Sequence, residues 1–389
     1  MTDRRHTLGR VSVVRGWQRW LLVGLGVALV SSLPAVIALW PPPAVAVDPA
    51  RLRDLVVASA DRPYQGYVDS RGHLNLPDLP VIGDVLALAG DSTRIRTWYA
   101  GPGSWRVATL TATGERDMYR TAEGTYVWDF ERSQVSFTSG ELPVRLPWAA
   151  DLPPPELARR ILSAASPSDS LTAIRSRRVA GVAAAGLRLR PSDPESTVAW
   201  VDVWADPDTG LPVRVEVTGE GAGDPVLVSE FLDLEQTRPD PALLVPALPA
   251  DAGVSEVGGN DIAEAVAKVA PVFLPQSLAG RDSINPTLFD SSVRVLVPGI
   301  SAYGGGLSTF VVLALPGRVG GDAMERLRRA RGVPFTIGPS RGYELRVDLL
   351  TALIVHVEGR PGRHHTYLFA GLVTPELLRR AATDLITGP

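Results

Sequence analysis

Short runs of alternating apolar and polar residues fill the first half of the chain. Six of these runs are rich in Val, Thr, Tyr and Trp and are bounded by Gly, Pro, Ser or Asp: 64–70, 93–100, 104–112, 115–121, 125–130 and 133–138. β-Branched and aromatic residues favour strands, and short strands at regular intervals are typical of antiparallel sheets. The pattern predicts an antiparallel meander between residues 64 and 138.

Two segments beside the meander have the spacing of amphipathic helices. Asp48 is a suitable N-cap, Pro49 fits a first helical turn, and the apolar residues that follow share one face, which predicts a helix over 48–60. A second helix is predicted over 156–165, directly after a Pro-rich stretch. Both are candidates to cover one face of the sheet.

The clearest hairpin in the chain follows a strand region near 177–190. Segments 198–204 and 211–217 are joined by Asp-Pro-Asp-Thr-Gly, and a last strand is predicted over 225–234. The joining run resembles part of a calcium loop, but its Gly is misplaced and the Glu of a twelfth position is missing. Turn residues of this kind predict a hairpin rather than a metal site.

A second domain is predicted after residues 238–260, which are rich in Pro, Ala, Asp and Gly and have the composition of a linker. The linker separates a large domain, 48–237, from a smaller one, 261–389. Helical and strand patterns alternate in the smaller domain and predict a mixed α/β fold, with helices at 261–269, 321–331 and 375–385 and strands near 291–297, 307–315, 333–338, 342–348, 350–358 and 365–371.

The N-terminal 47 residues have a different character. Residues 1–19 carry five arginines and one aspartate, and residues 20–40 contain no charged side chain. An apolar helix of that length spans about 30 Å, the thickness of a bilayer core, and a basic flank stays in the cytoplasm. The pattern predicts a cytoplasmic tail at 1–19 and a single-pass membrane anchor at 20–40, with the remainder outside the cytoplasm. A cleaved signal peptide, which would give a secreted protein, is the alternative, because Ala44-Val45-Ala46 fits a cleavage site.

Composition and charge exclude several classes of function. The chain has 39 basic and 42 acidic residues, a net charge of −3 and no cysteine. Disulfides, thiolate metal sites and thiol nucleophiles are therefore excluded, and a balanced charge argues against a nucleic-acid-binding protein. Lys268 is the only lysine and follows no glycine-rich loop, so a P-loop is excluded as well. No cofactor is predicted.

Catalytic motifs give no support to an enzyme. The sequence has no Gly-x-Ser-x-Gly elbow, and its five histidines do not have metal-ligand spacing. His364 and His365 are adjacent, so they would point to opposite faces of a strand. The interpretation is a non-catalytic protein, with an unrecognised hydrolase as a remote alternative.

The order of these elements resembles a known family. A membrane or signal segment, a helix, a Tyr64-Gln65-Gly66-Tyr67 strand, a Trp-rich meander and the Trp204-to-Val213 hairpin resemble the LolA-like (LolA/LppX-like) fold, and the additional C-terminal domain resembles MucB/RseB-type sigma-E regulatory proteins. The resemblance covers about residues 48–385, and its most distinctive motif is the Asp-Pro-x-Thr-Gly-Leu-Pro turn. It implies an α+β fold: a half-open antiparallel β-barrel whose concave face is covered by helices.

The resemblance also implies a function. Proteins of this kind sense a lipid or the acyl chains of a lipoprotein and contact the extracytoplasmic part of an anti-sigma factor or another single-span membrane protein. A LolA-like carrier or envelope-assembly protein without a regulatory role is the alternative, and a retained anchor favours a tethered sensor over a shuttling carrier.

Candidate ligand-binding residues are the large apolar side chains of the half-barrel. The inner face of a half-open barrel needs helices or a guest to cover it. Residues 74–90 form an apolar, proline-kinked segment that is predicted to be a movable flap over the cavity, with a fixed lid or a part of the core as the alternative. Tryptophan lines apolar pockets but also serves as core filling, and alternation alone does not say which strand face is concave. The candidates are Tyr67, Leu76, Leu79, Ile82, Trp98, Trp105, Leu110, Trp128, Phe130, Trp200 and Trp204.

Overall fold

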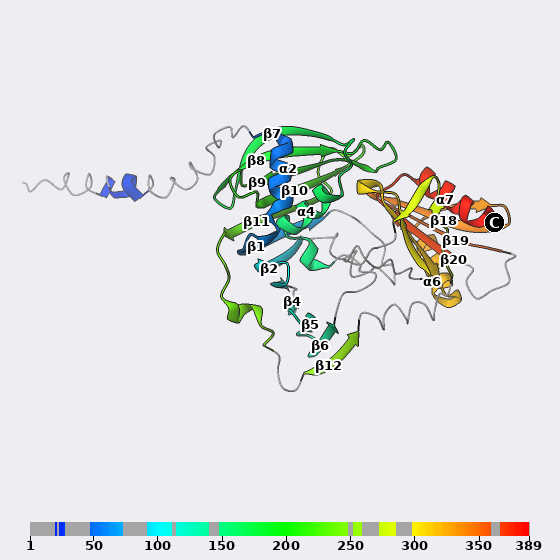
Figure 1. The fold of residues 1–389 in the computed structure, drawn as a ribbon, viewed down its shortest axis with the longest axis horizontal. Coiled ribbons are helices and arrows are strands. Elements are labelled where there is room, and N and C mark those ends of the chain that lie inside the picture. Colours follow the sequence, from blue (N-terminus) through cyan, green and yellow to red (C-terminus); the bar gives the residue numbers. More distant parts are fainter. Residues whose placement is uncertain are drawn as a thin grey trace, which may run out of the picture. The chain divides into compact units, whose positions relative to one another are not determined.

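The described chain contains two β-sheets, one of twelve strands and one of eight (Figure 1). They are seen in a computed structural model that describes residues 20–21, 23–27, 47–72, 92–110, 114–139, 148–247, 252–258, 272–284, 298–358 and 366–388.

The twelve-stranded sheet has the order β12-β6-β5-β4-β3-β2-β1-β11-β10-β9-β8-β7. Every neighbouring pair is antiparallel except β12 and β6, which are parallel. Because β12 and β7 are its two ends, the sheet is open and not a closed barrel. Its strands are β1 (Tyr64–Gly72), β2 (Ser92–Gly101), β3 (Ser104–Leu110), β4 (Glu115–Arg120), β5 (Gly124–Asp129), β6 (Gln134–Ser139), β7 (Ser170–Val179), β8 (Val182–Arg190), β9 (Val198–Ala205), β10 (Pro212–Gly219), β11 (Leu227–Glu235) and β12 (Gly253–Gly258).

The predicted meander and the predicted hairpin are both present in this sheet. In the turn between β9 and β10, the Asp206 carboxylate accepts hydrogen bonds from the backbone N–H groups of Asp208 and Thr209, at 2.9 and 3.2 Å. Gly210 has a φ of +72°, and a Cβ there would lie 2.4 Å from the carbonyl oxygen of Leu55. The turn therefore needs glycine both for its backbone conformation and for its close approach to helix α2.

Helices α2 (Pro49–Ala58) and α4 (Pro154–Ala164) lie on one face of the large sheet (Figure 1). As predicted, Asp48 caps α2, because its side chain accepts a hydrogen bond from the N–H of Arg51. Apolar residues of both helices pack on alternate residues of β8, β9 and β10 in one core: Leu52, Val56, Ala158, Leu162, Leu187, Leu189, Val201, Val203 and Val215. We call this side the helix-covered face. Short 3₁₀ turns η1 (Ser59–Asp61) and η2 (Ala149–Asp151) lie next to the two helices in the chain.

The eight-stranded sheet has the order β13-β14-β15-β16-β20-β19-β18-β17 and carries one helix on each face. Ile354 and Leu368 pack against α6 (Gly317–Arg329), while the neighbouring residues Leu353 and Phe369 pack against α7 (Pro375–Thr387). Consecutive strand residues point to opposite faces, so the two helices enclose the sheet. Its strands are β13 (Ser277–Leu278), β14 (Arg281–Ile284), β15 (Ile300–Tyr303), β16 (Phe310–Leu315), β17 (Val333–Ile337), β18 (Ser340–Val347), β19 (Leu350–His356) and β20 (Thr366–Gly371).

The region predicted as a linker, 238–260, contains ordered structure. Pro241–Leu244 form the 3₁₀ turn η3, and β12 pairs in parallel with β6 at one end of the large sheet. A parallel pair between distant segments leaves no local signal, since no turn connects the two strands. The predicted helix 261–269, the predicted strand near 291–297 and the predicted flap 74–90 lie outside the described residues.

The N-terminal segment is described by itself, because the chain divides into the units Met1–Pro43 and Ala44–Pro389. Residues 20–21 and 23–27 are helical and exposed, and the rest of the predicted anchor 20–40 lies outside the described residues.

Within the described part of the chain, we find no helix with both the length and the hydropathy needed to cross a bilayer.

The segment between β8 and β9 joins the large sheet to the small one. Its backbone forms a bridge between Ser196 and Val373, and the fully buried Thr197 donates its N–H to Leu372 O at 3.0 Å and its hydroxyl to the carbonyl of Leu349. Glu195 of the same segment pairs with Arg281 and Arg380 of the second sheet and of α7. These contacts are polar and buried or half-buried, so the junction depends on hydrogen bonds as well as on apolar packing.

Candidate ligand-binding cavity

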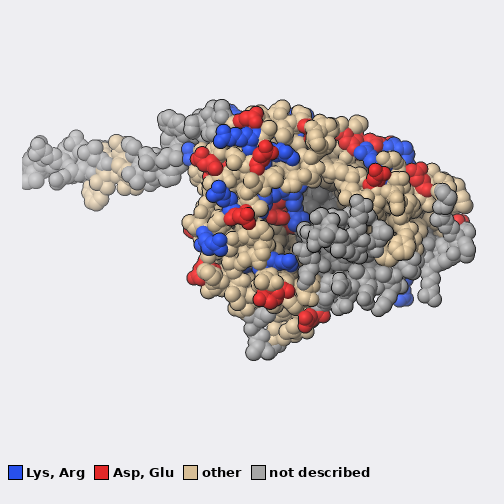
Figure 2. Space-filling view, in the orientation of Figure 1, with Lys and Arg blue, Asp and Glu red and all other residues tan. Residues whose placement is uncertain are grey.

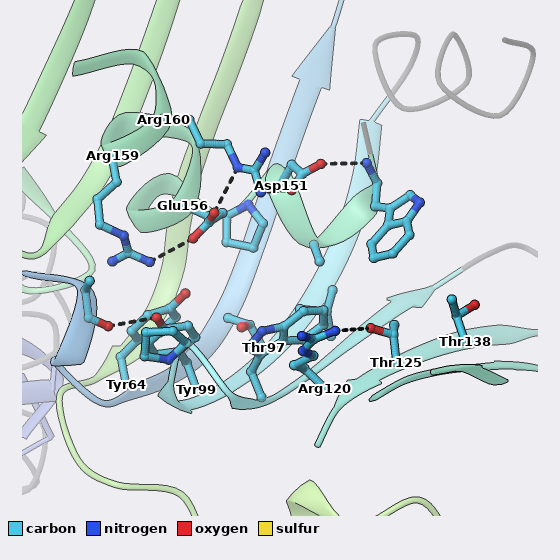
Figure 3. Close-up of a pocket in the computed structure, with 17 residues that line it drawn as sticks. Tyr64, Thr97, Tyr99, Arg120, Thr125, Thr138, Asp151, Glu156, Arg159 and Arg160 are labelled. Atoms are coloured by element: carbon cyan, nitrogen blue, oxygen red, sulfur yellow. Dashed lines mark hydrogen bonds and ion pairs between the residues drawn. The ribbon is translucent and has the colours of Figure 1, made fainter. Parts of the chain in front are cut away.

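A cavity of about 370 Å³ lies between the helix-covered face of the large sheet and the segment that leads through η2 into α4 (Figure 3). Strands of the meander supply its floor, and η1, η2 and α4 supply its roof and sides. The lining residues are Ala60, Tyr64, Thr97, Tyr99, Pro102, Trp105, Val107, Arg120, Thr125, Thr138, Trp148, Ala150, Asp151, Pro153, Glu156, Arg159 and Arg160.

One row of cross-strand neighbours forms the floor. Each residue pairs directly with the next across strands β1 to β6, in the order Tyr64, Tyr99, Trp105, Arg120, Thr125 and Thr138. Directly opposed residues of antiparallel strands have Cβ atoms about 5 Å apart on the same face. We call these six residues the floor row. It runs across the strands, as Figure 3 shows for its labelled members.

The first part of the floor row is aromatic. The rings of Tyr64 and Tyr99 stack with their centroids 4.9 Å apart, and the Tyr99 hydroxyl donates to Ala60 O at 2.7 Å. Burial raises the pKa of Tyr99 to about 12 and raises that of Tyr64 further, so both rings stay neutral. Trp105 continues this surface, and Trp148 lines the cavity as well. A neutral aromatic lining of this kind suits an apolar guest.

The second part of the floor row is polar. The Arg120 guanidinium donates to the Thr125 hydroxyl at 3.0 Å, and Thr138 follows on β6. The floor therefore changes along its length from aromatic rings to one cation with hydroxyl groups.

Charged residues of η2 and α4 form the roof as a chain of ion pairs. The Glu156 carboxylate binds the guanidinium of Arg159 at 2.9 Å and that of Arg160 at 2.8 Å, and Arg160 also contacts Asp151 at 3.0 Å. Arg159 is only 7 % exposed and lies with its Cζ 5.4 Å from the centre of the Tyr99 ring. These pairs fix the position of α4 over the floor row.

The ligand-binding residues predicted from the sequence, where the structure describes them, lie on both faces of the large sheet. Trp105 lines the cavity. Tyr67, Trp98, Leu110 and Trp128 extend from the opposite face, because each is separated from a cavity-facing residue of its own strand by an odd number of positions.

Trp200 and Trp204 also lie on that opposite face, beneath arginines. Arg188 and Arg190 lie over the ring of Trp200, at 4.5 and 5.0 Å from its centre, and Arg177 lies 4.7 Å from the centre of Trp204. The Trp204 indole N–H donates to Arg175 O at 3.0 Å. Cation–π contacts with these arginines stabilise the two rings on this face, where Trp204 is only 5 % exposed.

Phe130, the remaining candidate that the structure describes, does not line the cavity. Phe130, just after β5, is 54 % exposed and packs edge-on against Trp128. Leu76, Leu79 and Ile82 lie outside the described residues. Contact of these eleven residues with a ligand stays a prediction, and Trp105 is the one among the described candidates that lines the cavity.

Several cavity residues carried no recognisable signal in the sequence. Tyr64, Tyr99 and Arg120 lie in predicted strands, but only the pairing register brings them into one row. Arg159 follows Glu156 by three positions, a spacing typical of an exposed helical ion pair, and nothing local indicates its burial. Asp151 and Trp148 meet through a tight turn, in which the Trp148 N–H donates to the Asp151 carboxylate at 2.7 Å.

A buried ionic cluster on the opposite face lies outside the cavity. Asp117 is 2 % exposed and pairs with Arg106 at 2.7 Å, and Arg106 also lies 4.6 Å from the ring centre of Trp98. Burial raises the pKa of Asp117 to about 6. Its Oδ1 atom has no hydrogen-bond partner among the described residues.

Charges of both signs alternate over the side of the molecule that Figure 2 shows. Arg188 pairs with Asp202 at 2.6 Å, and Arg177 pairs with Glu216 at 2.8 Å. Among the described residues, no group of three or more His, Asp or Glu side chains is arranged to hold a metal ion.

Comparison with known proteins gives similarity at the level of solved structures. No family model matches the sequence, and no curated protein matches it. The chain is similar to MucB in the Pseudomonas aeruginosa MucA/MucB complex, with 16 % identity over 86 % of this chain and 97 % of that chain and a TM-score of 0.48. A LolA superfamily protein from Nitrosomonas europaea matches with 13 % identity over 52 % of this chain and 99 % of that chain, at a TM-score of 0.25. MucB and LolA-like proteins are the two groups that the sequence resembles.

Proposed function

We propose that this chain is a non-catalytic, extracytoplasmic binding protein that holds an acyl chain of a lipid or lipoprotein in the cavity beneath α4 and, in response, modulates a single-span membrane partner such as an anti-sigma factor. The observation that supports binding is the cavity itself. Its floor row begins with three aromatic rings, and its volume of about 370 Å³ falls within the range of about 300–1,000 Å³ that is usual for small-molecule sites.

The position of the cavity supports the same proposal. Helices α2 and α4 fill the helix-covered face over β8, β9 and β10 with Leu52, Val56 and Leu162. Over β1 to β5, the elements that the structure describes on the same face are η1, η2 and the start of α4, which border the cavity. An open sheet needs cover on its apolar face, and a guest chain would supply that cover where helices do not.

Lipid analysis of the purified full chain tests this part of the proposal. After expression in a bacterial envelope, organic extraction and mass spectrometry are expected to give an acyl-chain compound in stoichiometric amount. Thr138→Trp places a large side chain at the β6 end of the cavity and is expected to lower that amount. Ser136→Trp is the matched control, because Ser136 lies on the same strand and face but is exposed and outside the lining.

Two outcomes would count against binding. A purified chain without any extractable acyl compound, which also takes up none from added vesicles, would refute it. Equal lipid content in Thr138→Trp and Ser136→Trp would show that any bound lipid lies elsewhere.

The extracytoplasmic location and the membrane partner are proposed from the sequence. Residues 1–19 and 20–40 are proposed as a cytoplasmic tail and a membrane anchor, followed by domains at 48–237 and 261–389. N-terminal sequencing of the mature protein would decide between a retained anchor and a cleaved signal. The partner follows from the resemblance to MucB/RseB-type regulators, and crosslinking in the native membrane should then capture a single-span anti-sigma factor. Capture of other envelope proteins alone would favour the carrier alternative.

A further inference from the structure

The apolar core beneath α4 is shared by the two sheets. On the side of the large sheet, Ala158 and Leu162 of α4 are fully buried in it. Leucines from three loops of the second sheet pack into the same core: Leu307, Leu349 and Leu372. Leu307 belongs to the 3₁₀ turn η4 (Gly306–Ser308), which lies between β15 and β16. The position of α4 therefore depends on residues of both sheets.

The C-terminal end of α4 also meets η4 through the backbone. Gly306 has a φ of +58°, and a Cβ there would lie 3.0 Å from the carbonyl oxygen of Ala164, the last residue of α4. Glycine permits both this backbone conformation and the close approach. The same turn is bonded to the junction between the sheets, because the Ser196 hydroxyl donates to Leu307 O at 2.9 Å. The η4 turn thus contacts both the end of α4 and the segment that joins the sheets.

The other end of α4 forms part of the roof of the cavity. Glu156, Arg159 and Arg160 line the cavity, together with Pro153 just before the helix. With eleven residues, α4 is about 16 Å long. One short and well-packed helix therefore reaches from the candidate binding site to the second sheet.

We propose that the cavity and the junction between the sheets are coupled through α4 and η4, so that a ligand in the cavity stabilises the docked arrangement of the second sheet. This inference rests on the proposed function and adds the route by which occupancy of the cavity reaches the second sheet. The direction of the effect follows from the structure, in which the formed cavity and the docked junction are present together. A ligand that binds this arrangement better than an undocked one shifts the equilibrium toward it.

Two backbone hydrogen bonds report on the junction. The Thr197 N–H donates to Leu372 O at 3.0 Å. The Thr374 N–H donates to Glu195 O at 2.9 Å. Both bonds join the segment between β8 and β9 to the segment after β20, and their amide hydrogens exchange with solvent when the junction opens. At a free ligand concentration of one hundred times Kd, an opening that abolishes binding becomes about one hundredfold rarer.

The test is hydrogen exchange of the full chain, followed by mass spectrometry of peptides that contain Thr197 and Thr374. The probe is decanoate, a single acyl chain, and its Kd is measured first by titration calorimetry. With decanoate at one hundred times that Kd, we expect exchange at both positions to slow at least tenfold. Exchange in β17, an end strand of the second sheet, should change less than twofold.

Leu307→Ala cuts the proposed route, because it removes the side chain that η4 packs into the shared core and changes no residue of the cavity lining. At one hundred times the variant's own Kd for decanoate, the slowing at Thr197 and Thr374 is expected to fall below threefold. Leu313→Ala is the matched control, because Leu313 is a half-buried leucine of β16 that packs in the core beneath α6. It should keep the slowing of the wild-type chain.

The outcomes separate this inference from the proposed function. Decanoate that binds the wild-type chain without slowing exchange at Thr197 and Thr374 would overturn the coupling and leave the cavity a binding site. Equal slowing in the wild-type chain and in Leu307→Ala would overturn the route through η4. A wild-type chain that does not bind decanoate would refute the proposed function as well. The wild-type comparison decides the coupling even if Leu307→Ala does not fold.

Discussion

Replacing Thr197 by valine tests how much one buried hydrogen bond contributes to the junction between the two sheets. Valine has nearly the same shape as threonine, so packing is kept and only the hydroxyl is lost. The carbonyl of Leu349, a residue that is 4 % exposed, then loses its donor and is left buried. A buried polar group without its partner costs about 1–3 kcal/mol. For domains of 150–250 residues, each kcal/mol shifts Tm by about 2–4 °C, so a fall of about 2–12 °C is expected.

The assay is equilibrium denaturation in guanidinium chloride, with the melting temperature from calorimetry as a second measure. Thr172→Val is the matched control, because Thr172 is exposed on strand β7 and should change the free energy of unfolding by less than about 0.5 kcal/mol. A free energy of unfolding for Thr197→Val equal to that of Thr172→Val would refute the reasoning, since it would mean that Leu349 finds another donor at no cost.

Three further predictions concern pH and packing. Burial raises the pKa of Asp117 to about 6, so the native state keeps a proton that the unfolded chain loses, and the free energy of unfolding falls as pH rises from about 4 to 6. Asp117→Asn should remove this pH dependence in urea titrations between pH 4 and 8. An unchanged dependence of the free energy of unfolding on pH would contradict the prediction. Burial acts to raise the pKa of Glu195, but hydrogen bonds from Arg380 and Arg281 outweigh it and lower the pKa, so stability is lost as pH falls below about 4.5. In acid unfolding experiments, Glu195→Gln should lose less stability over this range than the wild-type chain. Equal losses in the two proteins would argue against a stabilising role of these ion pairs. Leu162→Ala in α4 should lower the free energy of unfolding by about 2–5 kcal/mol, because it opens a cavity in the fully buried core beneath the helix. A loss under about 1 kcal/mol in denaturant unfolding would mean that the core closes around the gap.

Strands and helices could be predicted from the sequence wherever the signal is local. Alternating residues bounded by turn residues gave the meander from β1 to β6, and Asp48 with Pro49 marked the start of α2. The turn at Gly210 is local as well, because its positive φ needs glycine. Strand β12 could not be predicted, since its parallel pairing with β6 depends on a partner more than a hundred residues away.

The sheet face on which each candidate site residue lies could not be predicted from the sequence. Trp98 and Trp105 are equally aromatic and equally strand-like, yet one lies on each face of the sheet. Their faces follow from the register of β2 and β3 and from the side on which α4 packs, and both are tertiary facts. Trp200 shows the same limit, because its two arginine neighbours come from β8 and not from its own strand.

The floor row also links ligand affinity to the folding of the sheet. Each of its six residues belongs to a different strand, and a shift of one residue in any pairing would turn a side chain such as Arg120 away from the cavity. A ligand that lies along the row would therefore bind only when five neighbouring pairs have their native register at once. At a free concentration one hundred times its Kd, it would favour that arrangement by about 2.7 kcal/mol. Such a ligand would act as a template for the newly folding meander, selecting the correct alignment of hairpins from the misaligned ones.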